Sequence, residues 1–268
     1  MDIPAPFGRL TTAMITPFNK SGEIDWAGVE KLASHLISTG HDGLVLNGTT
    51  GEAPTTSDDE KDEIIKVVRK AVGSNIKLIA GAGNNETSHS VEQAKRAAKA
   101  GADALLVVTP YYNKPPQAGV AAHFTAMADA TDLPVVMYDI PGRTGIEIES
   151  DTIVKLFEHP RIVALKDAKG NVAATSWVIK RCGIPVYSGD DILNLPLLSK
   201  ARHILVPSTL RCRRIIDPEQ FHINHNHNSG DKFRLLKLRM FLQLLLAHAT
   251  FQLARRSKLL IFHTGIHL

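Results

Sequence analysis

Cysteine and aromatic residues are scarce in this sequence of 268 residues. It holds 2 cysteines, Cys182 and Cys212, and its aromatic content is 6%. The low cysteine count excludes a small domain held together by disulfides, and the spacing forms no CxxC metal or redox pair. The two cysteines therefore indicate no functional site.

Long apolar runs are also missing. The most apolar stretch of the C-terminal part, Leu235–Leu246, is short and contains Lys237 and Arg239, so it predicts no membrane span. Residues Met1–Pro4 lack the basic and apolar regions of a secretory signal. We therefore expect a cytoplasmic protein that has no membrane partner.

The composition is otherwise that of a folded protein, but charge is unevenly distributed. Residues 1–199 carry 19 Lys+Arg and 24 Asp+Glu, a net charge of −5, whereas residues 200–268 carry 12 and 3, a net charge of +9. The first segment also holds 17 of 19 glycines, and the second holds 7 of 12 histidines. We therefore treat 1–199 and 200–268 as separate segments. Because the basic excess lies in residues 200–268, it does not indicate a nucleic-acid partner for residues 1–199.

Short apolar runs alternate with longer helical patterns along residues 1–199. Predicted strands cover 10–15, 44–46, 78–80, 104–108, 135–138, 162–166 and 186–188. Predicted helices cover 26–39, 57–72, 87–100, 120–130, 150–158 and 172–181, with another starting near Asp191. Seven such units, and a possible eighth strand at 203–206, favour a (β/α)8 TIM barrel in the α/β class. No GxGxxG follows the first strand, which weighs against a doubly wound dinucleotide-binding sheet.

The chemistry of such a barrel lies where strands end and loops begin. After the second predicted strand, Thr49 and Thr50 lie among Gly48, Gly51 and Glu52. Backbone N–H groups of a glycine-rich loop can bind a small carboxylate. An ordinary turn is the alternative, and the residues alone do not separate the two.

Two tyrosines, Tyr111 and Tyr112, follow the fourth predicted strand, out of four in the whole chain. Either would suit a site at this end of the barrel, but a packed or interface aromatic is the alternative. For Tyr111 we favour the packing role.

The fifth predicted strand ends at Tyr138, and Arg143 follows it closely. A tyrosine at a strand end can transfer protons, and an arginine can bind a carboxylate through two hydrogen bonds. The alternatives are a core tyrosine and a surface ion pair.

Lys166 follows an apolar run at the end of the sixth predicted strand. If this side chain points into the barrel, burial lowers its pKa, and a neutral amine can form a Schiff base with a ketone. A lysine that extends to water is the alternative. After the seventh strand, Gly189 could present backbone groups to a substrate, whereas Asp190 and Asp191 could equally cap the next helix.

Together these motifs resemble the dihydrodipicolinate synthase family of pyruvate-dependent class I lyases. The resemblance covers about Pro6 to Ser199 and rests on five motifs in the family's order and spacing. They are Gly48–Glu52, Tyr111–Pro115, Tyr138–Gly145, Lys166–Ala168 and Ser188–Asp191. The family implies a carbon–oxygen lyase that condenses pyruvate with L-aspartate 4-semialdehyde to 4-hydroxy-tetrahydrodipicolinate. This is the first committed step of diaminopimelate and lysine biosynthesis.

The resemblance also implies a role for each candidate residue. Lys166 forms the imine with pyruvate. Tyr138, Thr49 and Tyr112 relay protons, and Tyr112 reaches in from a neighbouring subunit, so a homodimer, usually within a homotetramer, is implied.

Substrate binding falls to Thr50, Arg143 and Gly189. Thr50 and its loop hold the pyruvate carboxylate, and Arg143 holds the carboxylate of the semialdehyde. Neither a metal nor an organic cofactor is expected, because the lysine serves as the electron sink.

The chain departs from the family pattern beyond about residue 200. The glycine-rich eighth strand and the C-terminal helices of the family have no match there, and an apolar basic helix over 233–256 is predicted instead. A different reading frame or a divergent C-terminus would each explain this change. If this segment is the protein's real C-terminus, we expect barrel closure and tetramer assembly to be impaired.

A position linked to inhibition by lysine also departs from the family pattern. His89 occupies a position that is usually acidic in lysine-inhibited relatives, so we expect weak or absent feedback by lysine.

Two other functions fit parts of the same pattern. Another pyruvate-dependent aldolase, such as N-acetylneuraminate lyase or a keto-deoxy-sugar-acid aldolase, would share Lys166 and Tyr138. Arg143 and Tyr112 favour the semialdehyde enzyme, because a sugar substrate needs groups that bind hydroxyls. A catalytically inactive barrel is the second alternative, since the C-terminal segment is unusual.

Overall fold

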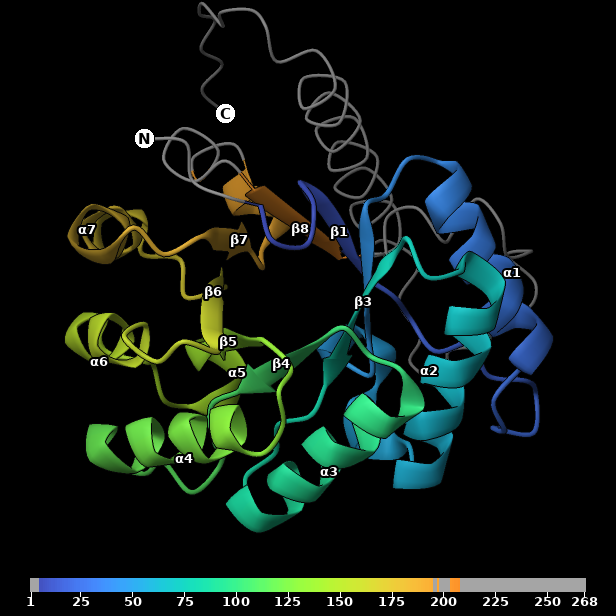
Figure 1. The fold of residues 1–268 in the computed structure, drawn as a ribbon, viewed down its shortest axis with the longest axis horizontal. Coiled ribbons are helices and arrows are strands. Elements are labelled where there is room, and N and C mark those ends of the chain that lie inside the picture. Colours follow the sequence, from blue (N-terminus) through green and yellow to red (C-terminus); the bar gives the residue numbers. More distant parts are fainter. Residues whose placement is uncertain (1–4, 195–196, 198–202, 208–268) are drawn as a thin grey trace, which may run out of the picture. The chain divides into compact units, whose positions relative to one another are not determined.

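A curled parallel sheet forms the centre of the molecule, and helices cover its outside (Figure 1). The computed structural model describes residues 5–194, 197 and 203–207. The strands are β1 (Leu10–Ala13), β2 (Gly43–Leu46), β3 (Lys77–Gly81), β4 (Ala104–Val108), β5 (Val135–Asp139), β6 (Ile162–Asp167), β7 (Val186–Ser188) and β8 (His203–Pro207).

Each strand pairs in parallel with the next one along the chain, from β1 to β8. The short strand β8 also pairs with β1, with Leu10 opposite Ile204. In the described residues, each of the first six strands is followed by an α-helix and β7 by a short 3-10 helix over Asp191–Leu193, which gives a fold like a TIM barrel, as the sequence predicts. A helix after β8, the apolar basic helix over 233–256 and the rest of 208–268 lie outside the described residues.

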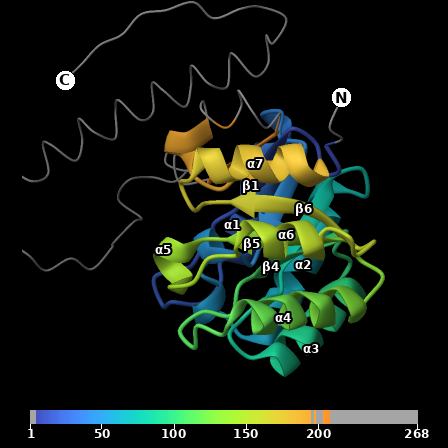
Figure 2. The ribbon, with the colours of Figure 1, turned by 90° about the vertical axis from the view of Figure 1, so that its left-hand side faces the viewer.

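The helices follow the strands along the chain, two of them after β5, and the longer helices pack on the outer face of the sheet. They are α1 (Trp26–Ser38), α2 (Asp58–Val72), α3 (Thr87–Ala100), α4 (Gln117–Asp129), α5 (Pro141–Thr144), α6 (Ser150–Leu156) and α7 (Val172–Cys182). Figure 2 shows α4, α6 and α7 side by side across one flank of the sheet. None of the helices in the described part of the chain has the length and apolarity needed to cross a membrane.

Local sequence signals account for the ends of these helices. Helix α2 begins after Ser57, whose side chain accepts from the Glu60 N–H while the Glu60 carboxylate accepts from the Ser57 N–H. This reciprocal pair is a capping box, and Gly73 ends the helix. Helix α3 begins at Thr87 and ends before Gly101, which takes a left-handed conformation.

Two apolar layers hold the fold together. One lies between helices and sheet, and the other fills the inside of the curled sheet. The inner layer includes Val136 and Tyr138 of β5 and Ala164 of β6. Successive side chains of a strand alternate between faces. Lys166, two residues beyond Ala164, is therefore directed to the inside, at the carboxyl end of its strand.

Candidate active site

Lys166 and Tyr138 form the centre of the candidate site. They lie opposite each other in the pairing of β5 with β6. The Lys166 Nζ lies 4.1 Å from the centroid of the Tyr138 ring, and the exposed fraction of each residue is only 4%. The two predicted residues are therefore brought together inside the sheet, as a barrel site requires.

Burial changes the protonation of the Lys166 amine. Removal from water lowers its pKa to about 7, because the charged ammonium loses hydration, while Asp191 acts in the opposite direction. Near neutral pH a large fraction of this amine is therefore neutral and nucleophilic. The alternative of a lysine that extends to water is not what the structure shows.

The Tyr138 hydroxyl lies within reach of the threonine loop. Burial raises the pKa of Tyr138, a side-chain hydrogen bond with Thr49 and the charge of Arg143 lower it, and Asp190 raises it. The structure thus brings Thr49 and Tyr138 together, and it places Arg143 close enough to influence the same hydroxyl.

Gly189 leaves room beside the amine. A Cβ atom at this position would lie 3.1 Å from Lys166 Cε and 3.0 Å from the Ala168 Cβ. The Gly189 N–H donates to the Asp167 carbonyl at 2.7 Å. Gly189 therefore borders the reactive lysine, and because its N–H already donates to Asp167, the binding role predicted for it stays a prediction.

The threonine loop has a fixed shape. Thr49–Gly51 forms a short 3-10 helix, and Glu52 after it has a φ of 56°. The Thr16 hydroxyl donates to the Gly51 carbonyl at 2.7 Å, and Gly51 has no space for a side chain because the Met14 carbonyl lies 3.0 Å from the Cβ position. Thr50 is half-buried in this loop.

Tyr112 and Arg143 lie farther out, on exposed segments. Tyr112 is 86% exposed and has a φ of 71°, an unusual conformation for a tyrosine. Its N–H faces the Thr144 carbonyl of α5 at 3.4 Å. Arg143 is exposed on the same short helix. Within one chain Tyr112 does not line the cavity described next, whereas Tyr111 does.

A cavity of about 480 Å³ opens beside Tyr138 and Thr49, and Lys166, Arg143 and Gly189 are not among the residues that line it. Tyr138 and Thr49 line one part of it, and polar residues from α2 and α3 line another. Its walls include Asn47, Gly48, Thr49, Ser57, Asp58, Lys61, Asn84, His89, Gln93, Tyr111 and Tyr138.

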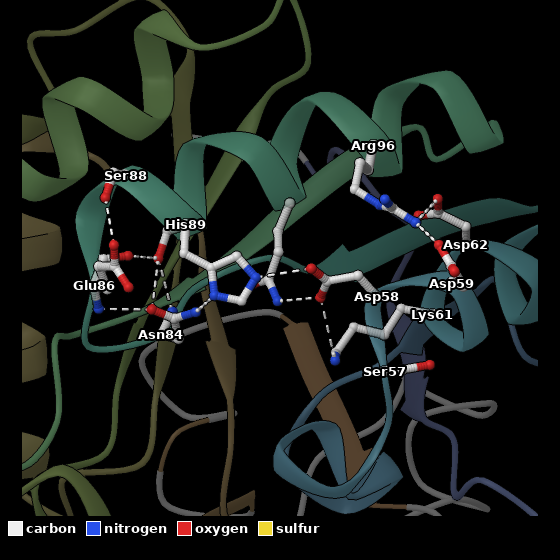
Figure 3. Close-up of polar contacts among 12 residues, drawn as sticks. Ser57, Asp58, Asp59, Lys61, Asp62, Asn84, Glu86, Ser88, His89 and Arg96 are labelled. Atoms are coloured by element: carbon white, nitrogen blue, oxygen red, sulfur yellow. Dashed lines mark hydrogen bonds and ion pairs between the residues drawn. The ribbon is translucent and has the colours of Figure 1, made fainter.

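The polar wall is organised around Asp58 (Figure 3). Its carboxylate oxygens lie 2.8 Å from His89 Nε2 and 2.9 Å from Gln93 Nε2, and Lys61 Nζ lies 3.7 Å away. Although burial alone would raise the pKa of Asp58, hydrogen bonds from Gln93 and His89 and the charge of Lys61 hold it below its ordinary value. Asn84 contacts the other ring nitrogen of His89 at 2.9 Å. This wall holds α2 and α3 together.

Three features of the site were not predicted from the sequence. The electrostatic contact of Asp191 with Lys166 was one, since the sequence suggested only helix capping. The Asp58 network was another, because its members come from separate helices. The third is a buried pair, Asp139 and Lys169, behind the strand ends, with Nζ 3.1 Å from Oδ2. Alternation along β5 would have placed Asp139 on the outer face.

Residues 6–213 match the model of the dihydrodipicolinate synthetase family. A curated relative, 4-hydroxy-tetrahydrodipicolinate synthase 2 of Streptomyces coelicolor, is 51% identical over 233 residues, which cover 87% of this chain and 77% of the relative. The 4-hydroxy-tetrahydrodipicolinate synthase of Acidothermus cellulolyticus is 59% identical over 196 residues, 73% of this chain. The aligned part spans 64% of the Acidothermus protein, slightly less than two thirds.

Solved structures agree with the sequence relatives. A dihydrodipicolinate synthase from Bacillus anthracis superposes with a TM-score of 0.75 at 37% identity, covering 92% of this chain and 83% of the other. The enzyme from Cyanidioschyzon merolae, solved with lysine bound, gives 0.75 at 40% identity, covering 92% and 88%.

Proposed function

Because this chain belongs to the dihydrodipicolinate synthetase family, we propose that it condenses pyruvate with L-aspartate 4-semialdehyde. The product is 4-hydroxy-tetrahydrodipicolinate, and the reaction is the first committed step of diaminopimelate and lysine biosynthesis. Its relatives at 51% and 59% identity carry the name 4-hydroxy-tetrahydrodipicolinate synthase, which makes the chain a lyase.

One observation supports the proposal most strongly: the buried Lys166 amine, whose pKa is about 7, lies against the Tyr138 ring. The neutral amine adds to the keto carbon of pyruvate, and the keto oxygen leaves as water to give an imine. Loss of a methyl proton converts the imine into an enamine. The enamine carbon adds to the aldehyde carbon of the semialdehyde, and the substrate amine then displaces Lys166 as the ring closes.

Each of these steps moves a proton, and we assign these proton transfers to Tyr138, Thr49 and Tyr112. Tyr138 and Thr49 interact within one chain. Tyr112 is 86% exposed, so its side chain is free to enter the site of a neighbouring subunit. A homodimer, alone or within a homotetramer, is therefore part of the proposal.

Two carboxylates must also be held. We assign the pyruvate carboxylate to Thr50 and the backbone of its loop, next to Gly189, and the semialdehyde carboxylate to Arg143. Arg143 is exposed at the site's edge, where a second substrate arrives after the first has reacted. A guanidinium binds a carboxylate through two parallel hydrogen bonds.

The remaining parts of the proposal concern the whole chain. We propose that β8 completes a (β/α)8 barrel, that residues 1–199 supply its first seven units, and that 200–268 form a divergent segment. The lysine imine serves as the electron sink, so the proposed reaction requires neither a metal nor an organic cofactor. We also propose that the protein is cytoplasmic.

Borohydride trapping tests the proposed function. The protein is mixed with pyruvate, reduced, digested and analysed by mass spectrometry. We expect one reduced pyruvate adduct, on Lys166, and none in a Lys166→Ala variant. A folded wild-type protein that forms no adduct would support the inactive-barrel alternative instead.

A further inference from the structure

A buried charge cluster lies directly behind the reactive pair. Asp139 and Asp167 follow Tyr138 and Lys166 in their strands, and they lie opposite each other in the pairing of β5 with β6. Their exposed fractions are 0% and 2%. Because side chains alternate along a strand, these two carboxylates point to the helix layer, away from the reactive amine. Buried carboxylates require charged or hydrogen-bonding partners.

Lys169 is the charged partner of Asp139. Its Nζ lies 3.1 Å from Asp139 Oδ2, and the lysine side chain is only 5% exposed. Among the ion pairs of the described residues, this is the one in which both side chains are almost fully buried. Burial raises the pKa of Asp139 to about 6, whereas Lys169 and the Ile148 N–H act to lower it.

Lys169 also reaches the segment that follows Arg143. Its Nζ donates to the Ile148 carbonyl at 3.0 Å and lies 3.5 Å from the Glu147 carboxylate. The Ile148 N–H in turn donates to Asp139 Oδ1 at 3.1 Å. Lys169, Asp139 and Ile148 therefore form one set of contacts.

Asp167 fastens the backbone of Lys169. Its Oδ1 accepts from the Lys169 N–H at 2.9 Å, and its Oδ2 accepts from the Thr175 hydroxyl of α7. The Ala168 N–H donates to the Asp139 carbonyl at 2.9 Å. The loop after β6 is thus held both to β5 and to the helix layer.

We propose that Lys169 is a positioning residue, whose buried ammonium joins the ends of β5 and β6 and so fixes the Lys166 amine against the Tyr138 ring. The inference rests on the proposed function, because the reaction starts at that amine. Without the ammonium, the buried Asp139 carboxyl has no cation and takes up a proton near neutral pH, and the contacts that join the ends of β5 and β6 through Lys169 are lost. Water then reaches the amine, which becomes protonated and poorly oriented.

The test compares Lys169→Met with wild type in the rate of pyruvate trapping at Lys166. We expect about a tenfold lower rate, since small displacements of reacting groups slow reactions by such factors. Lys180→Met, which changes an exposed lysine on α7, is the matched control and is expected to react at the wild-type rate. Equal rates for Lys169→Met and wild type, with the variant folded by circular dichroism, would overturn the proposal.

Three more variants separate positioning from stability. Val68→Ala opens a cavity on the buried side of α2, which contributes no residue to the cluster, and we expect it to lower the melting temperature without slowing trapping. The double variant Asp139→Asn with Lys169→Met removes both charges, so it should regain stability but remain slow. A double variant that regains the wild-type trapping rate would show that Lys169 acts only through stability. If Lys169→Met fails to fold, Asp139→Asn alone takes its place in the trapping comparison, with the same expected result.

A second measurement does not depend on pyruvate. Acetylation of Lys166 by acetic anhydride at pH 7 reports the reactivity of its amine directly, and we expect it to be several-fold slower in Lys169→Met. If wild-type protein forms no pyruvate adduct, the proposed function fails, and this comparison still decides the positioning role. Equal acetylation rates would then overturn it.

Discussion

The Lys166 amine lies 4.1 Å from the centroid of the Tyr138 ring, on the neighbouring strand. The amine therefore has an aromatic face on one side and the backbone of Gly189 on another. This arrangement leaves the Tyr138 hydroxyl at the far edge of the ring, next to Thr49. One residue can then shield the nucleophile with its ring and move protons with its hydroxyl.

Tyr138→Phe separates these two contributions. The ring remains, so we expect an adduct with pyruvate, but proton transfer loses its hydroxyl and kcat falls by about 100-fold or more. A coupled assay that consumes the product measures kcat, and borohydride trapping measures the adduct. Unchanged turnover would show that Tyr138 takes no part in proton transfer.

Trapping of pyruvate should depend on pH through the Lys166 amine. The pKa of this amine is lowered to about 7 by burial, so below pH 7 the charged form dominates and adduct formation falls about tenfold per pH unit. Above this pH the rate levels off. The check is the trapping rate from pH 5.5 to 9. A midpoint near pH 10 would mean that the amine is hydrated.

Arg143→Lys should affect the second substrate more than the first. A lysine retains the charge but loses the paired hydrogen bonds to a carboxylate, so KM for the semialdehyde should rise about tenfold. Trapping of pyruvate should not change. Turnover measured with N-acetylmannosamine or a sugar-acid aldehyde in place of the semialdehyde tests the other aldolase activities. Faster turnover of either compound would contradict the proposed substrate.

Lysine should inhibit weakly or not at all. This prediction rests on the family resemblance, which implies that His89 occupies a position usually acidic in lysine-inhibited relatives. His89 contacts Asp58 at 2.8 Å in the cavity wall. Initial rates are measured with sub-millimolar lysine, and His89→Glu serves as the comparison in which an acidic group is restored. Strong inhibition of wild-type protein would refute the prediction.

His123 should make the fold sensitive to acid. Burial lowers its pKa to about 4 from the ordinary 6.5, so below pH 6.5 the unfolded chain binds a proton that the folded chain excludes. At pH 5 the resulting loss in the free energy of unfolding is about 2 kcal/mol relative to neutral pH. Urea unfolding at pH 7 and pH 5 measures it. His123→Gln, which cannot titrate, should show a smaller difference between the two pH values.

Local patterns were sufficient for most of the framework. The helix over Thr87–Ala100 and the strand over Ala104–Val108 match the predicted ranges, because glycine and apolar periodicity mark their ends. Short helices were not predicted. The 3-10 turn at Thr49–Gly51 depends on the Thr16 hydroxyl, which lies 35 residues away, and no local pattern records that contact.

The candidate site shows the same contrast between local patterns and contacts of distant residues. Lys166 and Tyr138 were predicted because each ends an apolar strand, and the parallel sheet brings such ends together. Lys169 was not predicted as part of a buried pair. It lies in the loop after β6, between Ala168 and Gly170, and its burial depends on Asp139 and Ile148 from another unit.

The alternation of side chains along β6 carries a consequence for mutation. Lys166 and Asp167 face opposite sides of one strand, so inserting or deleting a single residue before them would exchange their places. The aspartate would then face the inside of the sheet, where Lys166 now lies against the Tyr138 ring, and the lysine would face the helix layer. A shift of one residue along β6 is therefore enough to turn the lysine away from the site. We expect insertions or deletions within this strand to be tolerated less than most replacements of its side chains.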